Sequence, residues 1–414
     1  MNRYKVKTLV FPDGERLPIL INRTSGIPEF YPNLFAITQL RQINCASNTI
    51  ERGLRDLAVL LDYFGDLQID AVKRVWDGEL FTFGEIDGLA RYCQKALKKM
   101  NKKQAKKVHF LDPKGAKAVP LVNKHTTAIR LRTIHRFLKW LIDLRRTQYD
   151  IDPKLRKKLD RDHTTVLEHL ASRIPKGTRR NVLRTKEALS PEQLEFLKDV
   201  ISPDSPCNPW KSDIVRHRNS LIIHMLLRTG LRCGELLGLK IDDIVFEDNF
   251  FEVARRPDDP DDPRRKEPNA KTLDRPKALS GELTDSLYDY IINIRSKIHG
   301  ANTHTFLIVS SKDGAPLSRH ALYDIFTTVR EHVEKLPSDF SSHICRHTFS
   351  TMFARALKES GHDEESSHQA LCEENGWVTG SDMPAHYTKP FIREQAREAS
   401  LSVQEKFTQE DCGE

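Results

Sequence analysis

Two arginines in the second half of the chain stand beside residues that would orient them. Arg232 follows a glycine turn in the run TGLRCGEL, which begins at Thr229, and we expect it on the first turn of a helix, braced by Glu235. Further along, His343 and Arg346 are three residues apart, a spacing that places both on one helical face. Guanidinium groups present paired, planar donors and stay charged at every physiological pH, so both arginines suit contacts with an anionic phosphate.

Trp377 and Tyr387 follow these arginines toward the end of the chain. Trp377 comes after an Asn-Gly pair, and Tyr387 is the only one of nine tyrosines beyond Arg346. Taken singly, these residues have ordinary interpretations: a surface arginine paired with a glutamate, a packing tryptophan and a core tyrosine. The interpretation changes when the four parts are read together and in order.

In this order the residues resemble the tyrosine recombinase (phage integrase) family. Its signature is an arginine in a T-G-L-R-x-x-E-L helix, then H-x-x-R, then a histidine or tryptophan after a glycine, and then a nucleophilic tyrosine. The resemblance covers about residues 190–406. It implies six catalytic residues in this chain, which are Arg232, Lys271, His343, Arg346, Trp377 and Tyr387.

The reaction implied by the resemblance is a transesterification that needs no metal, cofactor or ATP. Tyr387 would attack a scissile phosphate, form a 3′-phosphotyrosyl bond and release a 5′-hydroxyl, while Arg232 and Arg346 neutralise the anionic transition state. His343 would accept the phenolic proton or donate to the phosphate, because a tyrosine with a pKa of about 10 is neutral at pH 7. Trp377 would donate its indole N–H to the phosphate.

Two of these assignments have alternatives. The family places its general acid, a lysine, on a β-hairpin turn that Lys271 matches, but an insert at 256–268 lengthens this hairpin. The segment between Arg346 and Trp377 is also longer than is usual in the family. The alternatives are Lys266 and Lys277 for the general acid, and His368 and His386 for the pocket residue.

The resemblance also implies partners and an assembly. Double-stranded recombination sites, such as those of a mobile element, would be the substrate, and a homotetramer would hold two duplexes through a Holliday junction. The rival functions use the same residues: a type IB topoisomerase, a hairpin-forming resolvase, or a DNA-binding module that has lost catalysis. His343 and His347 have a spacing that also suits zinc, but no third ligand is evident.

The distribution of charge favours a polyanionic partner. The whole chain has a net charge of +8. Residues 95–187 hold 27 lysines and arginines against 8 acidic residues, a net +19, so the remainder carries −11. One concentrated basic zone in an otherwise slightly acidic chain is typical of a nucleic-acid-binding surface.

Composition excludes several classes of protein. A hydrophobic fraction of 38% and a charged fraction of 30% are typical of a soluble globular chain. The longest apolar stretch, residues 221–227, is far shorter than the roughly 20 residues that cross a bilayer. The N-terminal residues show no apolar run, so we expect no secretory signal. Seven scattered cysteines without a C-x-x-C pair favour a reducing cytoplasm, where a DNA-acting protein would be nucleoid-associated.

Hydrophobic periodicity predicts the elements that position these residues. Alternating apolar residues predict a small β element in residues 1–30, and helical spacing begins near residue 35. The clearest helix spans 126–146, with Thr126 or Thr127 as its cap and its arginines, Arg130 among them, turned outward. Further helices are expected at 83–100, 213–228, 232–239, 284–297, 319–333, 342–358 and 392–406, and strands at 243–246, at 250–254 and ending near 279.

The predicted fold is mainly α with a small antiparallel β-sheet (α+β), and the resemblance implies a helical core-binding domain joined to a tyrosine-recombinase catalytic domain. A capping box at Ser190 to Gln193 marks the start of the catalytic domain. The expected segments are an N-terminal β extension (1–30), a helical core DNA-binding domain (31–150), a basic linker (151–186) and the catalytic domain (187–414).

Overall fold

The computed structural model describes residues 3–96, 120–177, 188–268, 273–385, 387 and 396–405. The chain is divided into two compact units, Met1–Val182 and Leu183–Glu414. The basic zone begins with a lysine-rich run from Lys95 to Lys107, and its residues 97–107 lie outside the described residues. The candidate general acid Lys271 and the alternative His386 lie outside them too. Within the described ranges, no helix is long and apolar enough to cross a membrane.

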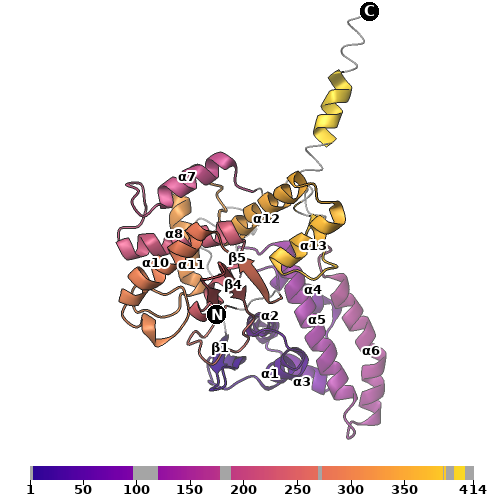
Figure 1. Cartoon of the computed structure of the whole chain (residues 1–414). Helices are drawn as coiled ribbons and strands as arrows, with labels where there is room; N and C mark the ends of the chain where they lie inside the picture. Colours follow the sequence, from indigo (N-terminus) through magenta and orange to yellow (C-terminus); the bar gives the residue numbers. More distant parts are fainter. Residues whose placement is uncertain are drawn as a thin grey trace, which may run out of the picture. The chain divides into compact units, whose positions relative to one another are not determined.

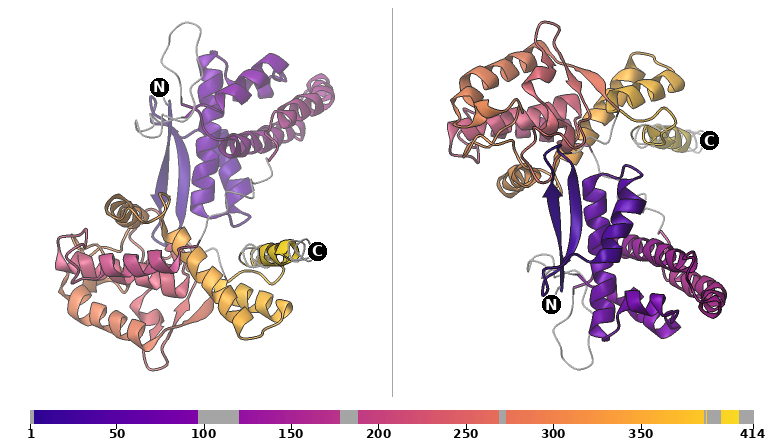
Figure 2. Two further views of the ribbon diagram at one scale, coloured as in Figure 1. Left: turned by 90° about the horizontal axis from the view of Figure 1, so that it is seen from above. Right: turned by 90° about the horizontal axis from the view of Figure 1, so that it is seen from below.

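The first unit is a β-hairpin followed by helices (Figure 1). Its two strands pair in antiparallel register from Tyr4 opposite Asn22 to Val10 opposite Arg16, and the hairpin lies along α2 (Figure 2). The turn between the strands contains Gly14 at φ 89°, a conformation that favours glycine. The elements are β1 (Tyr4–Val10), β2 (Arg16–Asn22), α1 (Phe30–Ala36), a π-helical turn (Ile37–Arg41), α2 (Ser47–Asp66), α3 (Ala71–Trp76), α4 (Phe83–Tyr92), α5 (Lys124–Arg146) and α6 (Pro153–Ser172).

Helix α5 begins two residues before the predicted start, and its cap was predicted at the wrong residue. Asn123, rather than Thr126 or Thr127, is the N-cap, because its Oδ1 accepts the backbone N–H of Thr126 at 2.7 Å. The apolar face of the helix is buried in the core of the first unit. The opposite face exposes Arg132, Arg136 and Lys139.

The prediction that Arg130 points outward is also wrong. Arg130 is buried, and its Nη1 donates to the carbonyl oxygens of Cys93 and Lys95, each at 2.7 Å. Helix α4 ends at Tyr92, short of the predicted residue 100, so these carbonyls lie just past a helix end and have no partner within the helix. The guanidinium of Arg130 supplies the missing donor. The segment predicted as a linker contains α6, which packs against α4 and α5.

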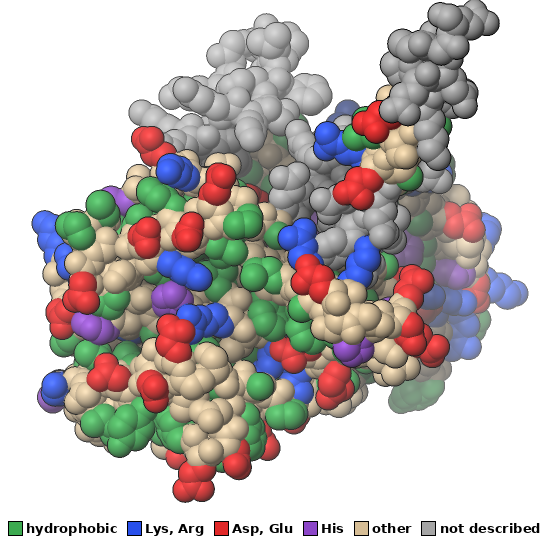
Figure 3. Space-filling model, turned by 45° about the horizontal axis from the view of Figure 1, so that its top comes forward, with side chains coloured by type: hydrophobic (Ala, Val, Ile, Leu, Met, Phe, Trp, Pro, Cys, Tyr) green, Lys and Arg blue, Asp and Glu red, His purple; other side chains and the backbone are tan. Residues whose placement is uncertain are grey.

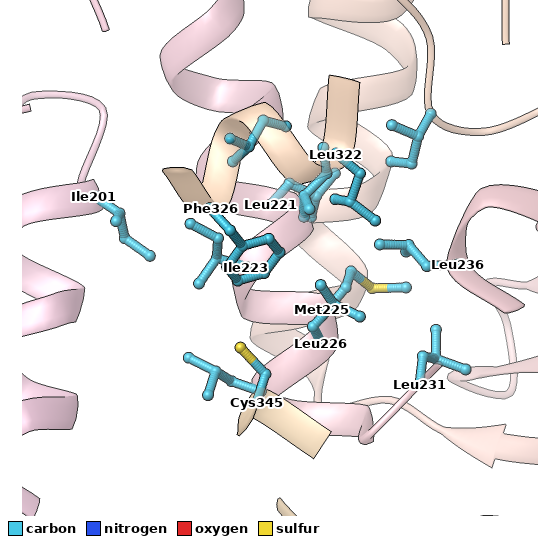
Figure 4. Packing of buried hydrophobic residues seen from close by; sticks show 14 of the residues in the cluster. Ile201, Leu221, Ile223, Met225, Leu226, Leu231, Leu236, Leu322, Phe326 and Cys345 are labelled. Atoms are coloured by element: carbon cyan, nitrogen blue, oxygen red, sulfur yellow. The ribbon is translucent and has the colours of Figure 1, made fainter. Parts of the chain in front are cut away.

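The second unit is a helical layer around one large apolar core, with a three-stranded antiparallel sheet in the order β3-β4-β5. Figure 4 shows how Leu226, Leu236, Phe326 and their neighbours fill this core. The predicted capping box is confirmed, since Ser190 and Gln193 cap α7 reciprocally. The elements are α7 (Pro191–Ile201), α8 (Asp213–Thr229), α9 (Cys233–Gly238), β3 (Ile244–Val245), β4 (Phe250–Val253), β5 (Arg275–Ala278), α10 (Gly281–Asp289), a π-helical turn (Tyr290–Ile294), α11 (Arg319–His332), α12 (Ser342–Glu359) and α13 (Glu364–Asn375).

These elements confirm the predicted class, a mainly helical fold with small antiparallel sheets. The helix predicted at 284–297 differs in kind over its second half: α10 begins at Gly281 and ends at Asp289, and the chain continues as the π-helical turn and a 3₁₀ turn. The insert after β4 is folded, because Arg264 pairs with Asp262 at 2.8 Å and donates to the carbonyl oxygens of Leu237 and Leu317. It therefore braces the end of α9. Figure 3 shows acidic and basic side chains interspersed over one face of the molecule.

Candidate active site

The turn between α8 and α9 places Arg232. Helix α8 ends in Gly230, whose φ of 62° is left-handed, and a Cβ there would lie 2.3 Å from the Phe349 ring, so glycine is required. Arg232 is the N-cap of α9 rather than a residue of its first turn. Its backbone N–H donates to Glu235 Oε2 at 2.9 Å, and its Nη1 donates to Oε1 at 3.2 Å. The predicted bracing by Glu235 is confirmed.

Helix α12 brings Arg346 to the same point. Arg346 is buried, and its Nη1 donates to the carbonyl oxygen of Gly230 at 2.7 Å. Its Nη2 donates to the carbonyl oxygen of Asn375 at 2.8 Å, and Arg232 Nη1 reaches this same oxygen at 3.3 Å. Asn375 is the last residue of α13, so no backbone N–H of the helix donates to its carbonyl oxygen. Both guanidinium groups are thus oriented by one carbonyl oxygen.

A third arginine, Arg275, joins this cluster from strand β5. Its Nη2 lies 3.1 Å from Glu235 Oε2, and both side chains are almost completely buried. The carboxylate of Glu235 therefore serves three cations, with Arg346 Nη1 at 3.9 Å as the most distant. Burial, with the charges of Arg232 and Arg275, lowers the pKa of Arg346 to about 9. Three guanidinium groups around one carboxylate leave an excess of positive charge that favours an anionic ligand.

Tyr387 packs beside this cluster with Trp377 and His347. Its ring is stacked on Trp377, with centroids 5.5 Å apart and planes at 18°, and its centroid lies 5.0 Å from that of His347. Arg346 Cζ lies 5.5 Å from the Trp377 ring centroid, so the tryptophan contacts both the arginine and the tyrosine. Burial raises the pKa of Tyr387, and the nearby charge of Arg346 opposes that rise. The phenol is therefore neutral near pH 7.

Trp377 holds a polar atom without a partner. Its indole Nε1 is buried and has no hydrogen-bond acceptor among the described residues. Leaving a buried donor unsatisfied costs free energy, and such a group calls for an explanation such as an absent ligand. An acceptor atom of a ligand bound beside Arg346 would satisfy it.

The other predicted site residues lie on α12, in the insert, on β5 and on α13. His343 is exposed on the first turn of α12, one turn before Arg346. Of the alternatives, Lys266 is exposed in the insert and Lys277 is buried in β5. His368 lies on α13, where its Nε2 is 3.1 Å from the carbonyl oxygen of Ser381. Within the part of the chain that the structure describes, no three histidine, cysteine or acidic residues are grouped to hold a metal.

Sequence reasoning missed Arg275, His347 and Asn375. A signal existed for the first, since the strand RPKA places basic residues at alternate positions, and both must lie on one face of a sheet. His347 directly follows Arg346, but nothing local indicates that its ring contacts Tyr387. Asn375 acts through its main chain, which leaves no signature in residue type.

Residues 189–367 match the sequence profile of the phage integrase family. A curated relative, the tyrosine recombinase XerD of Halalkalibacterium halodurans, is 25% identical over 241 residues, which cover 58% of this chain and 68% of the relative. The second unit therefore contains a phage integrase family domain, and the chain is similar to tyrosine recombinases. Transposase A of transposon Tn554 from Staphylococcus aureus is 30% identical over 142 residues, and the match spans about a third of each chain, 33% and 36%.

The fold of this chain is similar to that of a solved structure. The integrase of the Tn1549 transposon, determined in complex with transposon right end DNA, superposes with a TM-score of 0.50 at 17% sequence identity. The similarity covers 88% of this chain and 99% of the integrase. At this level of identity the likeness concerns the fold alone.

Proposed function

We propose that this protein is a tyrosine recombinase, which cleaves and rejoins DNA strands at specific sites through a covalent bond to Tyr387. One observation carries the proposal. A buried tyrosine, a tryptophan with an unpartnered N–H and two arginines that share a carbonyl acceptor converge around Trp377, whose ring lies 5.5 Å from both Tyr387 and Arg346. One donor without a described acceptor, two cationic groups and a nucleophile together suit a phosphodiester.

The proposed reaction exchanges one phosphoester bond for another. Tyr387 Oη attacks the phosphorus and its proton passes to His343, while the bond between phosphorus and the 5′-oxygen breaks. Arg232 and Arg346 donate to the non-bridging oxygens, where negative charge accumulates in the transition state. The departing 5′-oxygen takes a proton, for which we retain Lys271 as the donor. The attack of a 5′-hydroxyl on the phosphotyrosyl bond reverses the step, so no ATP or metal enters the balance.

Trp377 fills the remaining position of the phosphate pocket in this proposal. Its indole N–H would donate to a non-bridging oxygen, which would satisfy a buried donor that has no acceptor among the described residues. Of the two histidine alternatives, His368 is turned toward Ser381, where its Nε2 meets a carbonyl oxygen. We therefore keep Trp377 in the pocket.

Double-stranded DNA is the proposed partner, held by the first unit and cleaved by the second. The exposed face of α5 with Arg132, Arg136 and Lys139 supplies cations in a line along one helix, as phosphate contacts require. Two cleaved duplexes must be held together for exchange, so we propose a tetramer working at the nucleoid. Residues 396–405 form a helix that is exposed along its whole length, and we propose that it packs on a neighbouring protomer.

The test is capture of the covalent intermediate. The full chain is incubated in EDTA with a library of duplexes that carry a random central segment and one nick, so that cleavage near the nick releases a short strand and traps the adduct. We expect an SDS-resistant protein–DNA adduct from the unsubstituted chain and from Tyr149→Phe, whose tyrosine is 98% exposed and distant in sequence from the site. Tyr387→Phe should bind the selected duplex without forming the adduct.

Three results would count against the proposal. An adduct that survives Tyr387→Phe would show that another residue is the nucleophile, and an adduct that requires a divalent cation would exclude the mechanism. Relaxation of supercoils without exchange between two selected duplexes of different lengths would indicate a topoisomerase instead of a recombinase.

A further inference from the structure

The side chain of Arg275 links strand β5 to helices α9 and α13 at the candidate active site. On one side, Arg275 Nη2 lies 3.1 Å from Glu235 Oε2, the carboxylate that also holds Arg232. On the other side, Arg275 Nε donates to the carbonyl oxygen of Glu374 at 3.1 Å. One planar guanidinium therefore joins the first turn of α9 to the last turn of α13.

Two neighbouring contacts also join β5 and the residue before it to the end of α13. Lys277, on the same face of β5, forms an ion pair with the carboxylate of Glu374, and its Nζ lies 4.9 Å from the Phe349 ring centroid. Just before the strand, the backbone N–H of Leu273 donates to the carbonyl oxygen of Gly376 at 3.4 Å. Residues 273–277 are thus tied along residues 374–376, the turn that leads into Trp377.

This turn contains the acceptor that orients the two phosphate-binding arginines. The carbonyl of Asn375 takes hydrogen bonds from Arg232 and Arg346, and it lies between the two residues to which β5 is tied. A shift of Glu374 would move that oxygen, and a shift of Glu235 would move Arg232 directly. Arg275 contacts both Glu374 and Glu235.

We propose that Arg275 is a positioning residue for cleavage, which sets the directions of Arg232 and Arg346 through Glu235 and through the turn at 374–376. The inference rests on the proposed function. Arg275 does not touch the phosphate in this account, because its side chain is 2% exposed and its donors are directed to Glu235 and to the carbonyl oxygens of Leu273 and Glu374. An apolar side chain would fill a buried place at lower desolvation cost, so a buried arginine here is better explained by its hydrogen bonds.

Arg275→Met tests the proposal, with Arg295→Met as the matched control. Arg295 is also buried in the second unit, and it donates to the carbonyl oxygens of Phe306, Ala301 and His304, away from the arginine cluster. On the duplex selected by adduct formation, we expect Arg275→Met to bind DNA normally and to cleave about 10- to 100-fold more slowly in a single turnover. Arg295→Met should cleave at the rate of the unsubstituted chain.

A double-substitution cycle separates positioning from a general loss of structure. If Arg275 acts through Arg232, then Arg275→Met should add less than about threefold to the defect of Arg232→Lys, because the two changes remove one function. Arg275→Lys, which keeps the charge but not the planar fork, should fall between the unsubstituted chain and Arg275→Met. Equal slowing by Arg275→Met in both backgrounds, or full activity of Arg275→Met, would overturn the proposal.

Hydrogen exchange provides a readout that needs no DNA. In the free full chain, amides of residues 374–377 and 232–236 should exchange faster in Arg275→Met than in the unsubstituted protein and in Arg295→Met. Unchanged exchange in both segments would overturn the proposal. If the unsubstituted chain forms no adduct at all, the proposed function fails first, and a positioning role in cleavage fails with it.

Discussion

Arg232 and Arg346 donate to the same atom, the main-chain oxygen of Asn375, at 3.3 and 2.8 Å. One arginine caps the start of α9 and the other lies in the second turn of α12, so their common acceptor fixes two helices as well as two side chains. Because the acceptor belongs to the main chain, the directions of both guanidinium groups depend on how α13 ends. The geometry of the site is therefore set by this turn together with the carboxylate of Glu235.

Removing the charge of Glu235 should lower both the stability of the fold and the rate of DNA cleavage. Glu235→Gln keeps the shape of the side chain but leaves Arg232, Arg275 and Arg346 without their shared carboxylate. We expect the free energy of unfolding to fall by about 3–5 kcal/mol, the usual loss when one partner of a buried ion pair is removed. Urea denaturation measures the change.

Glu282→Gln is the control for this prediction. Glu282 pairs with Arg228 at 2.9 Å, but its side chain is 75% exposed, so the free energy of unfolding should change by less than about 1 kcal/mol. Similar losses in both variants would contradict the view that Glu235 neutralises a buried cationic cluster.

The unpartnered N–H of Trp377 should matter to cleavage more than to folding. Trp377→Phe keeps a ring to stack on Tyr387 and removes the only polar atom. We expect single-turnover cleavage to slow by about 100-fold, the scale of one lost donor to a transition-state oxygen, with the melting temperature little changed. Trp210→Phe, at the edge of the main core, should leave the cleavage rate unaltered. Normal cleavage by Trp377→Phe would remove the indole from the phosphate pocket.

Lys277 should make stability rise at alkaline pH. Burial lowers its pKa from 10.5 to about 8, against the opposing charge of Glu374. Below pH 8 the buried Lys277 side chain stays charged in the folded protein. The free energy of unfolding is then lowered by the full cost of desolvating that ammonium group. Between pH 8 and 10.5 the unfolded chain still holds the proton that the folded protein has released, so the penalty disappears as the pH rises.

The unsubstituted protein should therefore gain free energy of unfolding relative to Lys277→Met between pH 8 and 10.5. Denaturation curves of both proteins at several pH values in this range measure the difference. Lys312→Met, which changes an exposed lysine, should show no such trend. A difference between Lys277→Met and the unsubstituted protein that stays constant with pH would show that Lys277 is not held at a lowered pKa.

Two exposed cations on α5 should contribute to DNA binding through charge alone. Replacing Arg132 and Lys139 by alanine should weaken binding to every duplex alike and reduce the slope of log K against log salt by about 2, one unit for each lost phosphate contact. The matched pair is Arg146→Ala with Arg173→Ala, because these arginines already pair with Asp160 and Asp87. Equal effects from both pairs would mean that α5 presents no DNA-binding face.

Much of the second unit could be predicted because its signals are local. The serine, proline and glutamine that open α7 form a capping box, and the alternation of residues near 250 and 275 indicated strands. The bracing of Arg232 by Glu235 follows from helical spacing alone. The order of the motifs along the chain indicated the family for the same reason, since each motif is a short run.

The remaining contacts depend on residues that are distant in the sequence. Arg130 has the position of a surface arginine in the helical pattern, but it is buried because the end of α4 leaves carbonyls that need a donor. Arg275 and Asn375 meet Arg232 and Arg346 only once β5, α9 and α13 are packed together. No period or spacing within one element contains this information.

The most direct test of the account is to identify the residue that holds the DNA. The trapped adduct from the unsubstituted chain is trimmed with nuclease and digested with protease, and the modified peptide is sequenced by mass spectrometry. We predict a single nucleotide-bearing peptide with the 3′-phosphate ester on Tyr387. A modification at any other residue, or an adduct joined through the 5′ end of the broken strand, would contradict it.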